Sequence, residues 1–130
     1  MAEKMRVLLV EQMEEPKLVE IEHTLENLQK LVGGYIQSIY PWADPVALVC
    51  NDEAKIIGMP ANRLLEDYDL ICGPFFICGL TTDDFGSLSD EMARKYMEKF
   101  RHPEIFMRTD RGIMVIKVGS GKPPREIRFR

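Results

Sequence analysis

The chain has 130 residues, of which 45% are hydrophobic and 29% charged, close to the averages of soluble globular proteins. A chain of this length usually forms one domain with one hydrophobic core. No apolar run approaches the roughly 20 residues that a membrane helix needs, and the chain does not begin with the pattern of a secretory signal. We therefore expect a cytoplasmic protein, neither membrane-bound nor secreted.

The net charge of −4 hides an uneven distribution. Residues 1–104 contain 10 Lys and Arg against 19 Asp and Glu, a balance of −9, whereas residues 105–130 contain 7 against 2, a balance of +5. A basic tail of this kind can bind nucleic acid or an acidic partner, or it can lie on the acidic body of its own chain. Its last basic residues are Lys122, Arg125, Arg128 and Arg130.

The N-terminal third predicts a β-hairpin followed by a helix. Residues 5–10 are apolar and β-branched, and residues 17–22 alternate in polarity after a turn at residues 14–16. Thr24 can cap a helix, and two glycines at residues 33–34 offer a left-handed stop. The apolar side chains on one face of this helix are Leu25, Leu28, Leu31 and Val32.

Short strands are expected to follow. Residues 35–40 and 46–50 have strand character and are separated by a turn with two prolines. Residues 51–54 predict a hairpin turn into a strand at 55–58. Residues 59–67 predict a loop or a single helical turn that covers one edge of the sheet.

The second half predicts strands on either side of a helix. Residues 68–80 are too apolar for an exposed strand, and Gly73 and Pro74 divide them into two strand segments. Ser87, Ser89 and Asp90 begin a helix that Pro103 ends.

The last segment predicts a hairpin. Residues 105–109 and 112–118 form its strands around a turn at 110–112. The tail beyond Gly119 is expected to be loosely held, or to add an edge strand, because Ile127 and Phe129 alternate with polar residues.

Together these elements predict an α+β fold, a mostly antiparallel sheet packed by two main helices in a single domain. We place the domain at residues 5–119, after an extension at 1–4 and before a basic tail at 120–130. The expected core consists of Met5, Val7, Leu9, Leu28, Leu31, Val46, Leu48, Ile71, Phe76, Met92, Tyr96 and Phe100.

Six stretches of the sequence resemble a known family. In chain order they are residues 5–11, 31–36, 46–53, 58–63, 71–79 and 85–91. They look like successive signatures of the family called domain of unknown function 3846, which bacteria, phages and conjugative elements carry. The family name implies no activity. The resemblance implies a setting among accessory genes of mobile elements, where small proteins often counter host defences.

Nothing in the sequence predicts catalysis. His23 and His102 are expected at the surface or beside helix ends, and no phosphate loop, nucleophile elbow or paired-histidine motif occurs. The acidic pairs at residues 52–53 and 83–84 could bind a divalent cation but are expected to be solvated. Three cysteines, Cys50, Cys72 and Cys78, lie in apolar segments, where reduced thiols pack as small hydrophobic groups. We predict no enzyme, no cofactor and no metal.

Three binding functions remain. In the first, the protein is a non-enzymatic accessory protein of a phage or mobile element that binds and inhibits a host defence component, such as a CRISPR or restriction system, through an acidic face or the Trp42 loop. In the second, an oligomer sequesters a nucleotide-like small molecule, with Arg63 and tail arginines as phosphate donors and Tyr40 or Trp42 stacking. In the third, the basic tail binds DNA.

For the binding site we select polar and aromatic residues in predicted loops, where a rigid sheet can present them to a partner. These residues are Trp42, Asn51, Asp52, Asn62, Arg63, Asp83 and Asp84.

Overall fold

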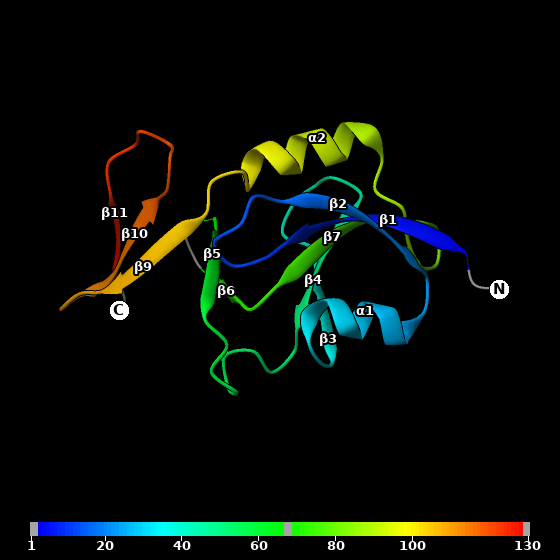
Figure 1. The fold of residues 1–130 in the computed structure, drawn as a ribbon, viewed down its shortest axis with the longest axis horizontal. Helices are drawn as coiled ribbons and strands as arrows, with labels where there is room; N and C mark the ends of the chain where they lie inside the picture. Colours follow the sequence, from blue (N-terminus) through cyan, green and yellow to red (C-terminus); the bar gives the residue numbers. More distant parts are fainter. Residues whose placement is uncertain (1–2, 67–68, 129–130) are drawn as a thin grey trace.

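The computed structural model describes residues 3–66 and 69–128 and contains a central antiparallel sheet (Figure 1). Its strands lie in the order β2-β1-β7-β4-β3, and β8 pairs with the end of β7. The strands are β1 (Lys4–Val10), β2 (Lys17–Glu22), β3 (Ile36–Ile39), β4 (Val46–Asn51), β7 (Phe75–Leu80) and β8 (Phe85–Gly86).

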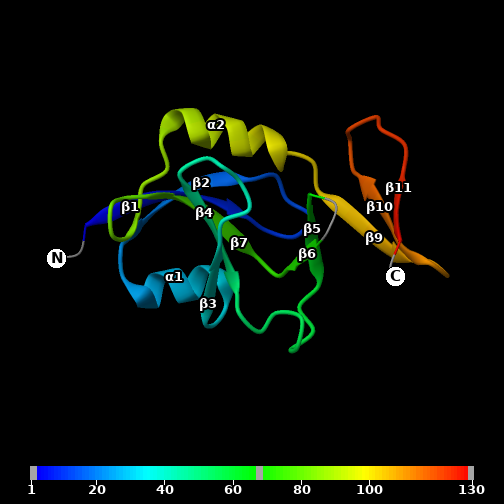
Figure 2. The same ribbon diagram turned by 180° about the vertical axis from the view of Figure 1, so that it is seen from behind.

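One helix covers each face of this sheet. Helix α1 (Leu25–Val32) and helix α2 (Asp90–Lys99) lie on opposite sides of it in both Figure 1 and Figure 2. Thr24 caps α1 by accepting a hydrogen bond from the Asn27 amide at 3.1 Å, and Ser89 caps α2 in the same way. Gly33 ends α1 with a φ of 77°, a left-handed conformation that glycine adopts without strain.

The sheet is buried on both faces, so its central strands do not alternate between apolar and polar residues. In β1, Val7 and Leu9 pack on the α1 side while Leu8 and Val10 pack on the α2 side. The predicted core included Val7 and Leu9 of this strand but not Leu8 and Val10. Among the other residues of the predicted core, Leu31 and Met92 are half-buried and pack against the core edge.

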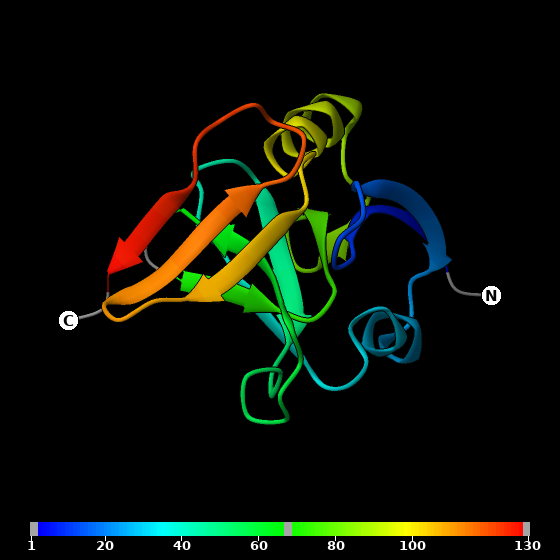
Figure 3. The ribbon, with the colours of Figure 1, turned by 60° about the vertical axis from the view of Figure 1, so that its left-hand side comes forward.

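Two smaller sheets extend the body at one end. Strands β5 (Ala61–Leu65) and β6 (Asp69–Cys72) form a two-stranded ribbon, called here the β5–β6 ribbon. Strands β9 (Glu104–Arg108), β10 (Gly112–Lys117) and β11 (Arg125–Arg128) form a three-stranded sheet, called here the C-terminal sheet. Figure 3 shows this sheet, yellow-orange to red, in front of the green ribbon, and β5 and β9 are in contact.

The predicted α+β class with antiparallel pairing is confirmed. So are the first hairpin, the capped helices, the division at Gly73 and Pro74, and the hairpin around residues 110–112. Of the two alternatives for the tail, the edge strand is found, since β11 pairs with β10. At the other end, Lys4 already belongs to β1.

Two predictions between β4 and β6 are wrong. Residues 55–58 form no strand, because hydrogen-bonded turns occupy them, with the Ile57 amide donating to the Glu53 carbonyl at 3.0 Å. The predicted loop or helical turn at 59–67 contains β5 instead. Pro60 stands just before that strand. Pairing with β6 overrides the weak strand propensity of this segment, although the register shifts between Ala61 and Arg63, where Asn62 has no paired residue in β6. Asp67, Tyr68, Phe129 and Arg130 lie outside the described residues.

Among the residues that the structure describes, no helix is long and apolar enough to cross a membrane.

Candidate functional site

Arg63 and Asn62, which we expected to be exposed, lie in β5 and are 1% and 0% exposed. The Arg63 guanidinium donates to the Phe100 carbonyl from Nε at 3.2 Å and from Nη2 at 3.0 Å, and to the Glu14 carbonyl at 2.6 Å. Its Nη1 donates to the side chain and backbone oxygens of Asn62. These contacts account for all five N–H groups of an arginine, so Arg63 has none left for a phosphate group.

Asn62 is bonded with equal completeness. Its amide nitrogen donates to the carbonyls of Val10 and Gly73, both at 3.0 Å, and its oxygen accepts from Arg63. The pair therefore ties the β5–β6 ribbon to the end of β1, to the β1–β2 turn and to the C-terminal end of α2, where a positive charge is favourable. The pair thus has a structural role, and the expectation that these two residues stand exposed in a loop is wrong.

The other predicted binding residues are not brought together. Trp42 packs against Tyr96 beneath α2, with 4.6 Å between ring centroids, and its Nε1 donates to Glu66 at 2.8 Å. At the end of β4, buried Asn51 donates to the Val32 carbonyl at 3.1 Å, and Asp52 beside it is exposed.

Asp83 and Asp84 stand in a third place, the exposed turn between β7 and β8, where Asp84 lies 3.6 Å from His23. Within the described ranges, no group of three His, Cys, Asp or Glu side chains is placed to hold a metal ion.

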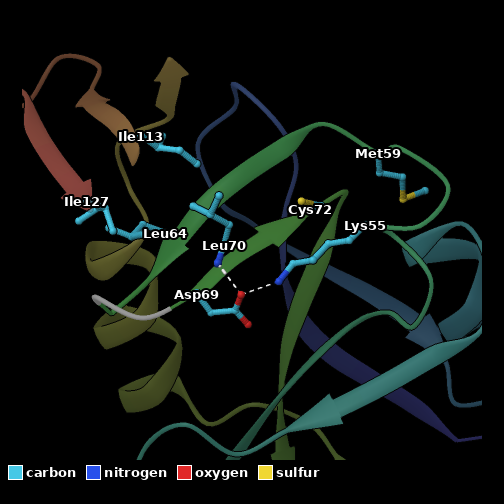
Figure 4. A pocket seen from close by; sticks show the side chains of 8 residues that line it. All are labelled: Lys55, Met59, Leu64, Asp69, Leu70, Cys72, Ile113 and Ile127. Carbon is cyan, nitrogen blue, oxygen red and sulfur yellow. Dashed lines mark hydrogen bonds and ion pairs between the residues drawn. The ribbon is translucent and has the colours of Figure 1, made fainter. Parts of the chain in front are cut away.

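A hollow with mostly apolar walls lies between the β5–β6 ribbon and the C-terminal sheet, and we call it the apolar groove (Figure 4). Its volume is about 380 Å³, within the range of small-ligand pockets. Leu64 and Leu70 form one wall, and Ile113 and Ile127 the other. The full lining is Lys55, Met59, Leu64, Asp69, Leu70, Cys72, Ile113 and Ile127.

The polar groups of the groove sit at its rim. Lys55 Nζ lies 2.5 Å from Asp69 Oδ1, and the same oxygen accepts the Leu70 backbone N–H at 2.8 Å (Figure 4). Burial raises the pKa of the Cys72 thiol, which keeps it protonated and unreactive. A hollow with apolar walls, one ion pair and a neutral thiol can bind a ligand but offers no activated nucleophile.

A second, charged hollow of about 120 Å³ lies on the other side of β5 and contains Lys99, Lys117 and Glu104. Glu104 Oε1 accepts the Leu64 amide at 2.7 Å, while Oε2 has no hydrogen-bond partner among the described residues. Burial raises the pKa of this carboxyl. The hollow is smaller than typical ligand pockets, and its contacts join β5 to β9.

His102 and the cysteines outside the apolar groove lie elsewhere in the fold. His102 Nδ1 lies 3.1 Å from the Val118 carbonyl, between α2 and β10. Burial raises the pKa of the Cys78 thiol to about 12, and burial also raises the pKa of Cys50. All three cysteines are free, Cys78 fully buried.

The basic residues of the segment 105–128 lie in two places. Arg108, Arg111 and Arg128 surround the β9–β10 turn. Arg125 and Lys117 line the charged hollow beside Glu66 and Glu104. Part of the tail therefore does face acidic residues of its own chain, and part of it faces outward. Lys122 is exposed in the connection between β10 and β11.

The sequence interpretation missed the groove residues. Leu64 and Leu70 stood in segments interpreted as a loop and as core, and Ile127 in a tail with two alternatives. The signal that could have found them is alternation within the C-terminal hairpin, which puts Ile113 and Ile127 directly opposite each other on one face.

A family model described as "Domain of unknown function (DUF3846)" matches residues 5–101. This match spans the central sheet, both helices and the β5–β6 ribbon, and the C-terminal sheet lies beyond it. No curated protein and no solved structure matches the chain.

Proposed function

The chain belongs to the family of domain of unknown function 3846, whose description names no activity, and we propose from the site itself that the protein works by binding a partner protein rather than by catalysis. The apolar groove is the binding site in this proposal. The partner places apolar side chains between the β5–β6 ribbon and the C-terminal sheet.

One observation carries this proposal: a hollow of about 380 Å³ with apolar walls exists between two elements that are each well ordered by their own contacts. Apolar walls with a few polar groups at the rim are typical of binding sites. The neutral Cys72 thiol and the Lys55–Asp69 ion pair supply no group for bond making.

The partner's identity is a further part of the proposal. The phage and mobile-element setting implied by the family suggests a host defence component in the cytosol, which the bound protein inhibits. The acidic balance of −9 over residues 1–104 supports a basic partner, because complementary charge speeds association. The nucleotide-sequestering alternative loses its main phosphate donor, since Arg63 is fully engaged.

Two matched substitutions test the groove. Ile113→Arg places a charge in the groove wall, whereas Ile116→Arg places the same charge on the opposite face of β10, and both isoleucines are half-buried. The tagged variants are expressed in the host cell, cross-linked and purified, and co-purifying proteins are identified by mass.

We expect one partner to be retained by the natural protein and by Ile116→Arg but to be absent with Ile113→Arg. Retention by all three, or no selective partner, contradicts the proposal. Matching circular dichroism spectra of the two variants show that the comparison concerns binding and not folding.

A second candidate function rests on the three arginines around the β9–β10 turn. They form an outward basic cluster that a nucleic-acid backbone could contact. Replacing Arg108, Arg111 and Arg128 by Ala should lower the slope of duplex affinity against salt by about one for each phosphate that the variant no longer neutralises. Arg94→Ala, on exposed α2 surface, is the control. An unchanged slope excludes this function.

A further inference from the structure

Strand β6 has one free edge. On one side it pairs with β5, and among the described residues no strand pairs with its other side. The Leu70 N–H points to that other side, because its acceptor is the carboxylate of Asp69 and not a β5 carbonyl. A side chain of the strand itself thus occupies the place where a neighbouring strand would put a carbonyl oxygen.

Two hollows lie along this edge, one on each face of β6. The first is the apolar groove. The second, of about 170 Å³, lies between β6 and the strands β3 and β4 and includes Ile39, Cys50 and Ile71. The residues common to both hollows are Lys55, Asp69, Leu70 and Cys72. Strand β6 is therefore the wall between two binding hollows.

The direction of the β6 side chains matches this arrangement. Successive side chains of a strand point to opposite faces. Leu70 and Cys72 line the apolar groove and also border the second hollow, whereas Ile71 between them is buried in the core and lines the second hollow alone. An added strand beside β6 would alternate in the same way, so its odd side chains would enter one hollow and its even side chains the other.

We propose that the partner binds as an extended segment that adds to the free edge of β6 as a third strand of the ribbon, an inference that rests on the proposed function of the groove. The segment carries apolar residues at alternate positions. Its carbonyl oxygen replaces the Asp69 carboxylate on the Leu70 N–H, so the exchange leaves no donor unsatisfied.

Charge and exposure around the edge specify the partner further. The second hollow has Asp52 and Asp69 against Lys55 as its only other charged lining residue in the described part of the chain, an acidic excess. The segment should therefore contain a Lys or Arg beside its apolar residues. Ile56, at the rim of the same hollow, is 84% exposed. An added strand would cover it.

The probe is a display library of random peptides of about ten residues, the upper end of common strand lengths, selected on the full chain. We expect enriched peptides with apolar residues two apart, a basic residue and no internal proline. In a bound peptide, the backbone amide that faces β6 should donate a hydrogen bond to that strand, so N-methylation of this amide should weaken binding about tenfold. N-methylation of the next amide of the peptide, which faces away from β6, should leave binding unchanged.

Leu70→Pro removes the N–H on the free edge and should weaken the same peptides by a similar factor. Since that variant can fail to fold, the N-methyl series on the natural protein gives the decisive measurement. Any of three outcomes overturns strand addition. The enriched peptides carry apolar residues at spacings of three and four, or the chain self-associates through β6, or no peptide is enriched. The Ile113→Arg experiment is independent of the peptide selection. If Ile113→Arg loses the cellular partner but the selected peptides have helical spacing, the groove remains the binding site and strand addition is wrong. If Ile113→Arg retains the cellular partner, the proposed function itself is wrong.

Discussion

The central sheet and the C-terminal sheet are both antiparallel, yet they bury their side chains differently. The central sheet is covered on both faces, and Val7, Leu8 and Phe76 are each at or near zero exposure. The C-terminal sheet is covered on one face only, since Val115 is buried while Ile105 and Met107 are 40% and 48% exposed. The central sheet therefore offers a ligand its edge at β3 and β4 and not its faces.

The difference shows where binding can occur. The family match ends at residue 101, and the C-terminal sheet begins at Glu104. The apolar groove forms where the two parts meet, with one wall from each. Stability should therefore come mainly from the central sheet, and in the proposed function recognition takes place at the junction.

The largest effect is expected where the β5–β6 ribbon, one side of the junction, is held to the body. Arg63→Met leaves the carbonyls of Phe100 and Glu14 without their donor inside the protein. A buried acceptor left unsatisfied costs about 1–3 kcal/mol, so with two carbonyls affected we expect a loss of about 2–5 kcal/mol, which urea unfolding measures. Arg111→Met, on the exposed β9–β10 turn, should change stability by less than about 0.5 kcal/mol. Equal effects of the two substitutions would show that Arg63 does not hold the β5–β6 ribbon to the end of α2 and to the β1–β2 turn.

A smaller effect compares one valine from each sheet. Val49 in β4 is 0% exposed and Val115 in β10 is 3% exposed, and truncation of either to Ala should cost about 2 kcal/mol. Val49→Ala should lower global stability. Val115→Ala should instead speed amide exchange in β9–β11 alone, by about 25-fold if the C-terminal sheet opens locally. Uniform acceleration across the chain in Val115→Ala would mean that the two sheets unfold as one unit.

The sequence predicted most of the central sheet because its signals are local. Hydroxyl caps at Thr24 and Ser89, glycine at residue 33 and the bend at Pro74 act within a few residues of the elements they define. Strand β5 was missed for the opposite reason. Nothing in Asn62 and Arg63 favours a strand, and their hydrogen bonds reach Val10 and Phe100, 52 and 37 residues away in the chain.

The site was harder to predict than the fold. Its two walls come from Leu64 and Ile127, which only the packing of two sheets brings together. The polar residues chosen from the sequence were selected because polarity in a predicted loop suggests exposure. Asn62 and Arg63 show the limit of that rule, since complete hydrogen bonding allows even an arginine to be buried.

The third prediction concerns the contact of α2 with the loop that carries Trp42. The Tyr96 hydroxyl donates to Asp44 Oδ2 at 2.6 Å, and Tyr96 is 1% exposed. Tyr96→Phe keeps the ring packing against Trp42 and removes only this hydrogen bond, at a cost of about 1 kcal/mol. Asp44→Asn should reduce stability without shifting the exchange of the C-terminal sheet. Faster exchange in β9–β11 after either change would show that this contact also supports the second sheet.

The smallest effect is a pH dependence at the junction. Burial raises the pKa of Glu104 above its ordinary value of 4.5, so the folded state binds this proton more tightly than the unfolded chain does. The resulting stability is fully present below the unfolded pKa and is lost as pH rises through the folded pKa. Glu104→Gln should therefore flatten the decline of unfolding free energy above about pH 4.5, the unperturbed range of a glutamate.

Glu66 provides a control of opposite sign for the same titration. Hydrogen bonds from Lys99 and Trp42 lower the pKa of its carboxyl, so its contribution is present above the unfolded pKa and is lost as pH falls through the folded one. Glu66→Gln should flatten the acid side of the curve, whereas Glu104→Gln flattens the side above it. If both variants change the same side, the Glu104 carboxyl is not held in a poorly solvated contact with Leu64.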